Sequence, residues 1–131
     1  MMKHFVKILF ATILAISSCC TGEAGGSSVV SGKVYHHAKP IANAKVYVKY
    51  DAKDFPSTDV SVYNQAVTAG ADASYSISGL KCGDYYIYAT GIDDDLVAPE
   101  DLVTGGLYVK ISKDGSVVEK DVYVTEAGHL H

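Results

Sequence analysis

The chain contains no arginine and no tryptophan, and its 11 basic residues are all lysine. With 15 acidic residues, the formal net charge is −4. A nucleic-acid-binding role is therefore not expected, because phosphate contacts need a basic patch and arginine is the usual reader of base edges. Active sites that clamp a carboxylate or phosphate with a bidentate guanidinium group are excluded, because only arginine carries that group.

The sequence also lacks an apolar run long enough to remain in a membrane as a helix. The longest nearly apolar segment covers residues 5–16, which follow Lys3 and include Lys7. As a helix it would be about 18 Å long, whereas the hydrocarbon core of a bilayer is ~30 Å thick. This length and the positive flank are typical of the apolar part of a secretory signal peptide.

Residues 16–19, Ile-Ser-Ser-Cys, follow this run directly and resemble the lipobox of bacterial lipoproteins. The resemblance implies that residues 1–18 are the signal peptide and that Cys19 receives the lipid and becomes the mature N-terminus. Cys20 is a poorer acceptor, because Ser17 would then hold the aliphatic position of the motif. Two or three acyl chains suffice for stable anchoring, so we expect a domain held by its lipid outside the cytoplasm.

The lipobox resemblance also implies a location within the cell envelope. Residue 20 is not the Asp that retains proteobacterial lipoproteins at the inner membrane, so the outer membrane is the expected site. Residues 20–28 are small, polar and rich in glycine, and with Cys19 they are interpreted as a flexible tether. We favour no disulfide between Cys20 and Cys82, because one lies in this tether and the other beside a predicted turn.

From residue 29 onward, apolar and polar residues alternate with a period of two, and no amphipathic helix is indicated. The pattern predicts an all-β fold, a single Greek-key β-sandwich of about seven strands over residues 29–126, with a tail at 127–131. The expected strands are residues 29–36, 44–50, 62–68, 74–77, 85–90, 108–112 and 117–125. The last two are expected to form a hairpin around the turn at residues 113–116.

Several segments of this pattern resemble carboxypeptidase-regulatory-like domains, which have a transthyretin-like β-sandwich. The first is Ser-Gly-Lys-Val at residues 31–34, followed by Lys-Pro-Ile-Ala-Asn-Ala-Lys-Val at residues 39–46. The second half of the motif is carried by residues 68–73, 75–77 and 79–87. The resemblance covers roughly residues 29–125 and implies a non-catalytic module of the kind appended to enzymes, transporters and surface proteins.

Four histidines are candidate metal ligands: His36, His37, His129 and His131. Imidazole suits Zn²⁺, Cu²⁺ and Ni²⁺, although this spacing matches no defined zinc motif. If His36 and His37 lie in a strand, they point to opposite faces. The first and last strands of a Greek-key sandwich can lie near each other, so any metal is expected to join His36 to the C-terminal pair. The other interpretation is that none of them binds metal, with His36 and His37 in a solvated turn and His129 and His131 in a frayed C-terminus.

Two further groups are candidate ligand surfaces. Tyr86 and Tyr88 are expected on the outer face of their strand, where an exposed stripe of tyrosines can bind a ligand. Asp93 and Asp95 belong to an acidic loop expected over residues 91–104, which also contains Asp94, Glu100 and Asp101. The loop lacks the spacing of a calcium-binding EF-hand, so a solvated loop is the favoured interpretation.

The sequence thus predicts a lipid-anchored, non-enzymatic binding or structural module that needs no cofactor. Its expected partners are the membrane, through the lipid, and an envelope protein or glycan. Two alternatives remain open: a small envelope protein that binds metal through its histidines, and an enzyme that uses carboxylates of the acidic loop. A Gly-x-Ser-x-Gly nucleophile motif does not occur in the sequence.

Overall fold

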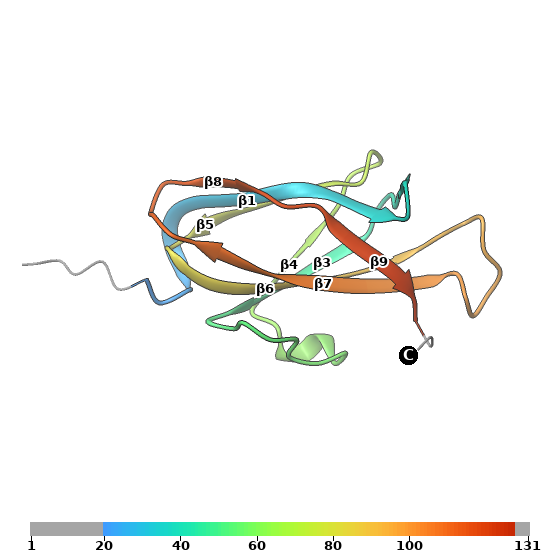
Figure 1. Cartoon of the computed structure of the whole chain (residues 1–131), viewed down its shortest axis with the longest axis horizontal. Helices are drawn as coiled ribbons and strands as arrows, with labels where there is room; N and C mark the ends of the chain where they lie inside the picture. The colour runs from blue at the N-terminus through green and yellow to red at the C-terminus, as the bar shows by residue number, and fades with distance from the viewer. Residues whose placement is uncertain (1–19, 128–131) are drawn as a thin grey trace, which may run out of the picture.

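The computed structural model describes residues 20–127 of the chain (Figure 1). They contain nine β-strands and one short 3₁₀ turn, joined by loops. The predicted all-β fold is confirmed, and these residues include no helix long and apolar enough to cross a bilayer. The elements are β1 (Ala24–His36), β2 (Lys39–Pro40), β3 (Lys45–Tyr50), η1 (Val60–Val62), β4 (Gln65–Thr68), β5 (Ser74–Leu80), β6 (Gly83–Ile92), β7 (Leu102–Ile111), β8 (Val117–Glu119) and β9 (Val122–Glu126).

The strands form a curled sheet whose two layers face each other across the core (Figure 1). In one layer, β1 lies between β5, which pairs antiparallel, and β8, which pairs parallel. The other layer has the order β4-β3-β6-β7 and is antiparallel throughout. Strand β9 joins the layers, because it pairs parallel with the end of β1 and antiparallel with the start of β7.

The core is formed by every second side chain of each strand, which points into the space between the two layers. Val46 and Val48 of β3 and Tyr85 and Ile87 of β6 have no exposed surface. Tyr85 and Ile87 alternate with Tyr86 and Tyr88, which were expected on the outer face, so the period-two pattern assigned the correct faces of β6. The core cluster also includes Val30, Val34, Ile41, Ile77, Leu80, Ala89, Val103, Val109, Ile111, Val122 and Val124.

The predicted tether is wrong over residues 24–28, which are part of β1 rather than a linker. Gly26 explains the error: a Cβ atom at this position would lie 2.2 Å from the carbonyl oxygen of Leu80. The glycine is required by the close approach of β1 to the end of β5 and does not indicate flexibility. The ordered domain therefore begins before residue 29.

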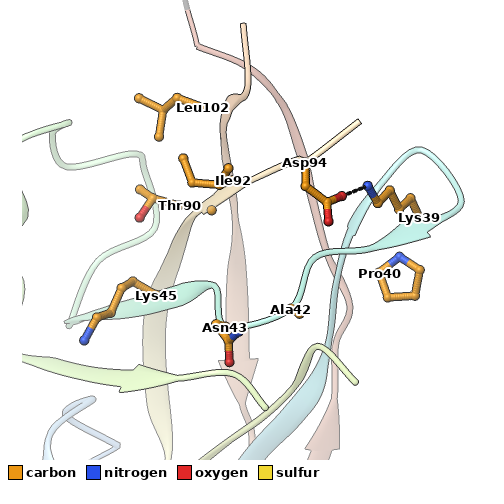
Figure 2. A pocket seen from close by; sticks show the side chains of 10 residues that line it. Lys39, Pro40, Ala42, Asn43, Lys45, Thr90, Ile92, Asp94 and Leu102 are labelled. Atoms are coloured by element: carbon orange, nitrogen blue, oxygen red, sulfur yellow. Dashed lines mark hydrogen bonds and ion pairs between the residues drawn. The ribbon is translucent and has the colours of Figure 1, made fainter. Parts of the chain in front are cut away.

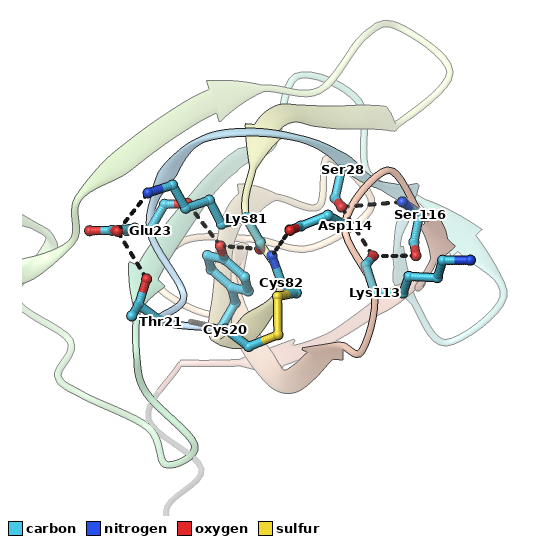
Figure 3. Close-up of a disulfide and its surroundings, with 10 residues drawn as sticks. Cys20, Thr21, Glu23, Ser28, Lys81, Cys82, Lys113, Asp114 and Ser116 are labelled. Atoms are coloured by element: carbon cyan, nitrogen blue, oxygen red, sulfur yellow. Dashed lines mark hydrogen bonds and ion pairs between the residues drawn. A yellow bond between two sulfur atoms is a disulfide. The ribbon is translucent and has the colours of Figure 1, made fainter. Parts of the chain in front are cut away.

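A disulfide joins Cys20 to Cys82, which corrects the expectation that they stay unpaired (Figure 3). Their Cα atoms are 4.5 Å apart. The chain after Cys20 is fixed by further contacts: the Gly22 amide donates to the Cys82 carbonyl (3.1 Å), and Glu23 forms an ion pair with Lys81 (2.9 Å). The N-terminal segment is thus docked on the junction between β5 and β6.

The C-terminal strands differ from the expected hairpin. The turn itself is confirmed, and Gly115 has the positive φ (78°) that its position requires. After the turn, however, the chain crosses to the other layer, where β8 runs parallel to β1. The amide of Lys120 donates to the Ser31 carbonyl (2.8 Å), and Asp121 accepts from the Lys33 amide (2.9 Å). These bonds fix β9 beside His36.

Candidate functional site

The most heavily charged buried site lies where β1 ends. His36 is the last residue of β1 and is only 4% exposed. Asp93, the first residue after β6, is also 4% exposed. Its Oδ2 atom lies 2.6 Å from Nδ1 of His36. Since buried charged side chains are normally paired, this contact explains why two polar residues are tolerated at the edge of an apolar core.

Lys39 connects this pair to the rest of the acidic loop. Its ammonium group donates to Oδ1 of Asp93 (2.7 Å), to Asp94 and to Oδ2 of Asp95 (2.9 Å). The Lys39 contact, with hydrogen bonds from His36 and from the Asp95 amide, holds the pKa of the Asp93 carboxyl well below its usual range. The three carboxylates in turn raise the pKa of Lys39. The network fixes the start of the loop against the turn that follows β1.

The second nitrogen of His36 has a different environment. Nε2 is buried and has no hydrogen-bond partner among residues 20–127. Its nearest acidic atom is Oε1 of Glu126, the last residue of β9, at 3.3 Å. His37 lies beside it, with the two imidazole centroids 4.4 Å apart. One donor atom each from His36, His37 and Glu126 can be chosen so that all lie within 4.8 Å of one another.

His36 and His37 were expected to point apart if both lay in a strand, and this condition is not met. His37 does not continue β1 but stands in the following turn, with φ at 55°. The reversal of the backbone breaks the strand alternation and brings the two rings together. His129 and His131, together with the predicted lipid attachment at Cys19, lie outside the described residues.

A hollow of about 530 Å³ adjoins the network on the side of Lys39 and Asp94 (Figure 2). One wall is the segment from Lys39 to Asn43, and the other is formed by the ends of β6 and β7. The lining is mixed, with the exposed apolar side chains of Ile92 and Leu102 near polar groups. The complete lining is Lys39, Pro40, Ala42, Asn43, Lys45, Thr90, Gly91, Ile92, Asp94 and Leu102.

The predicted tyrosine surface is only partly exposed. Tyr88 is on the outer face of β6 as expected, but it is 5% exposed. The ring of Tyr63 stacks on it with centroids 5.6 Å apart, and Phe55 meets it edge-on at 5.3 Å. Tyr86 is half-buried, and Phe55 lies against it as well, at 5.8 Å. The irregular segment before β4 therefore covers Tyr88, which belongs to a small outer aromatic core.

The structure thus brings together the two predicted aspartates of the acidic loop and adds Lys39 and Glu126 to the candidate site. Asp93 and Asp95 meet through Lys39, and the loop that carries them is shorter than expected because β6 and β7 reach Ile92 and Leu102. The sequence did not indicate Lys39 or Glu126 as site residues. Lys39 lies 54 residues from Asp93 in sequence, and only the strand topology joins them.

No family model and no curated protein sequence matches the chain. Solved structures resemble it, and one of them shares its fold. A Pseudomonas aeruginosa protein, provisionally described as carbohydrate-binding, is 14% identical with a TM-score of 0.50, over 78% of this chain and 91% of that one. A DUF3823 family protein from Parabacteroides merdae is 15% identical with a TM-score of 0.44, over 78% of this chain and 47% of that one. At these identities the similarity concerns the fold alone.

Proposed function

We propose that the chain is a lipid-anchored, non-catalytic binding module of a bacterial cell envelope, with a carboxypeptidase-regulatory-like β-sandwich. The observation that carries the binding role is the Lys39 network. By holding the acidic loop against the turn after β1, it gives the neighbouring hollow one rigid rim. A preformed concave surface loses less conformational freedom on binding than a mobile loop does.

A glycan is the ligand class that we propose for this hollow. Sugars present apolar ring faces and hydroxyl groups together, and the lining offers both kinds of contact, from Ile92 and Leu102 and from Asn43 and Thr90. The provisional carbohydrate-binding description of the P. aeruginosa protein agrees with this choice. None of the lining residues is aromatic, so we expect weak binding, with Kd on the order of 1 mM for a short oligosaccharide.

Amide chemical shifts would test the glycan proposal. Envelope-type oligosaccharides should shift the amides of Asn43, Thr90 and Leu102, and Thr90→Val should weaken the effect. Thr68→Val is the matched control, because Thr68 and Thr90 both pair with Lys45, from opposite sides, and Thr68 does not line the hollow. Shifts confined to another surface, or an equal loss in both variants, would contradict the site.

The non-catalytic part of the proposal has its own test. The protein should show no turnover of chromogenic glycosides, esters or peptides. A variant that combines Asp93→Asn, Asp95→Asn and Glu100→Gln removes the carboxylates that an enzyme in the acidic loop would use. Turnover in the original protein that disappears in this folded variant would establish the enzyme alternative.

Lipid anchoring is tested by replacing the acceptor thiol. Cys19→Ser should abolish incorporation of labelled fatty acid and move the protein from the membrane pellet to the soluble fraction. Fractionation of the unaltered protein then distinguishes the outer membrane from the inner membrane. A Cys19→Ser protein that still carries lipid contradicts the assignment of the anchor.

A further inference from the structure

The end of β1 contains a second arrangement that the binding role does not use. His36 Nε2 is buried, unpartnered among the described residues, and faces the Glu126 carboxylate at 3.3 Å. Two groups that both offer lone pairs repel each other at this distance unless a proton or a cation lies between them. The geometry of the remaining atoms is compatible with a cation.

Asp93 determines which nitrogen of His36 carries hydrogen in the neutral ring. Oδ1 of Asp93 already accepts from Lys39 (2.7 Å) and from the Asp95 amide (3.0 Å). Oδ2 is therefore the acceptor for Nδ1–H of His36, at 2.6 Å. In the neutral ring, Nε2 then presents its lone pair toward Glu126. A carboxylate that orients a histidine in this way is the usual outer partner of a metal-bound imidazole.

The distances also suit a metal ion better than a hydrogen bond. Ligands that lie ~2.0–2.1 Å from a tetrahedral ion are about 3.4 Å from one another. The separation of 3.3 Å between Nε2 of His36 and Oε1 of Glu126 has this value. Without a metal the two atoms form an ion pair if the ring is protonated, but their geometry does not meet that of a hydrogen bond among the described residues. A small displacement of the exposed His37 ring completes a set of three ligands.

We propose that His36 Nε2, His37 and Glu126 bind a divalent transition metal ion of the Zn²⁺ type, with Asp93 orienting His36. Two imidazoles and one carboxylate are ligands that Zn²⁺ accepts, and the fourth position is left for water or an exogenous ligand. The site differs from the predicted one because a strand residue, Glu126, takes the place given to His129 and His131. It does not depend on ligand binding in the hollow.

The test uses the purified protein after treatment with EDTA and dialysis. Competition between the protein and a chromophoric chelator for Zn²⁺ should show one saturable site. His37→Ala and Glu126→Gln should each weaken it by at least the 10- to 100-fold typical of losing an outer partner, because each removes a ligand. His37 is exposed and Glu126 is partly exposed, so the fold should survive both changes. Glu119→Gln, on the exposed part of the adjacent strand β8, is the matched control and should bind as the original protein does.

Nuclear magnetic resonance of the histidine nitrogens provides an independent readout. On addition of Zn²⁺, Nε2 of His36 should show the shift of a metal-bound nitrogen while Nδ1 keeps its proton. A chain that ends at Ala127 should retain the site. The proposal is overturned if no saturable binding occurs, if His37→Ala and Glu126→Gln bind as tightly as Glu119→Gln, or if removal of the tail alone abolishes binding.

Discussion

Nδ1 of His36 and Oδ2 of Asp93 lie 2.6 Å apart, although 57 residues separate them in the chain. This bond joins the end of β1 in one layer to the loop that leaves β6 in the other. Because the donor and the acceptor are both buried, the contact positions the loop without depending on flexible surface side chains. The adjoining hollow and the proposed metal ligands both rely on it.

Asp93→Asn should therefore destabilise the protein mainly through loss of an acceptor for Lys39 and His36. The folded-state pKa of Asp93 lies below its ordinary value of 3.8, so the stabilising effect is present above about pH 4 and is lost as the pH falls further. Urea unfolding at pH 6 and pH 3 should show that the variant loses less stability on acidification than the original protein. Asp95→Asn, at an exposed neighbour, serves as control; an equal response in both variants would contradict the role of Asp93.

Removal of the disulfide should cost much of the stability of the domain. The bond closes a loop of 62 residues, for which chain entropy alone gives roughly 4 kcal/mol. We expect Cys82→Ala to lower the free energy of unfolding by ~2–4 kcal/mol. The same decrease should follow reduction of the unaltered protein, and dithiothreitol should have no further effect on the variant. If dithiothreitol leaves the unaltered protein as stable as before, the pairing is wrong.

Tyr85 should make the protein sensitive to alkali. Its hydroxyl oxygen lies within hydrogen-bond distance of the Lys81 and Glu23 carbonyls (2.7 and 3.0 Å), either of which can accept its proton, and burial raises its pKa to about 12. A raised folded-state pKa means that stability is complete below pH 10 and declines between about pH 10 and 12. Tyr85→Phe should lose ~1 kcal/mol at neutral pH and show a shallower decline. A decline of unchanged steepness would exclude Tyr85 as a contributor.

Tyr88 should act as a packing residue. Because Phe55 and Tyr63 cover its ring, we expect Tyr88→Ala to lower the free energy of unfolding by ~2–4 kcal/mol. Tyr123→Ala is the comparison, since Tyr123 is 64% exposed and its removal should cost under about 1 kcal/mol. Thermal unfolding of both variants measures the difference. Similar stability in the two variants would show that Tyr88 remains available as a surface.

The period of two located most of the strands and the faces of β6, because burial on one side leaves a direct mark on the sequence. It missed the first six residues of β7 and the break between β8 and β9. The prediction from composition was wrong at the N-terminal end of the domain, where glycine residues were interpreted as a flexible tether. At Gly26 it reflects close packing against Leu80, which depends on a contact between distant segments. The same limit applies at the candidate site: acidic residues that lie next to each other were visible, but the lysine and glutamate that complete the site come from other strands.

The disulfide has a geometric consequence for the anchored protein. With the lipid on Cys19, as proposed, the very next residue is covalently fixed to the β5–β6 junction. The membrane then lies against that end of the sandwich with almost no slack. After the bulge at its start, where Ala24 and Ser28 both pair with Leu80, strand β1 runs from Ser28 to His36, about 26 Å further along the sheet. The domain would then hold the charged network around His36, Lys39 and Asp93 at a fixed distance from the bilayer surface.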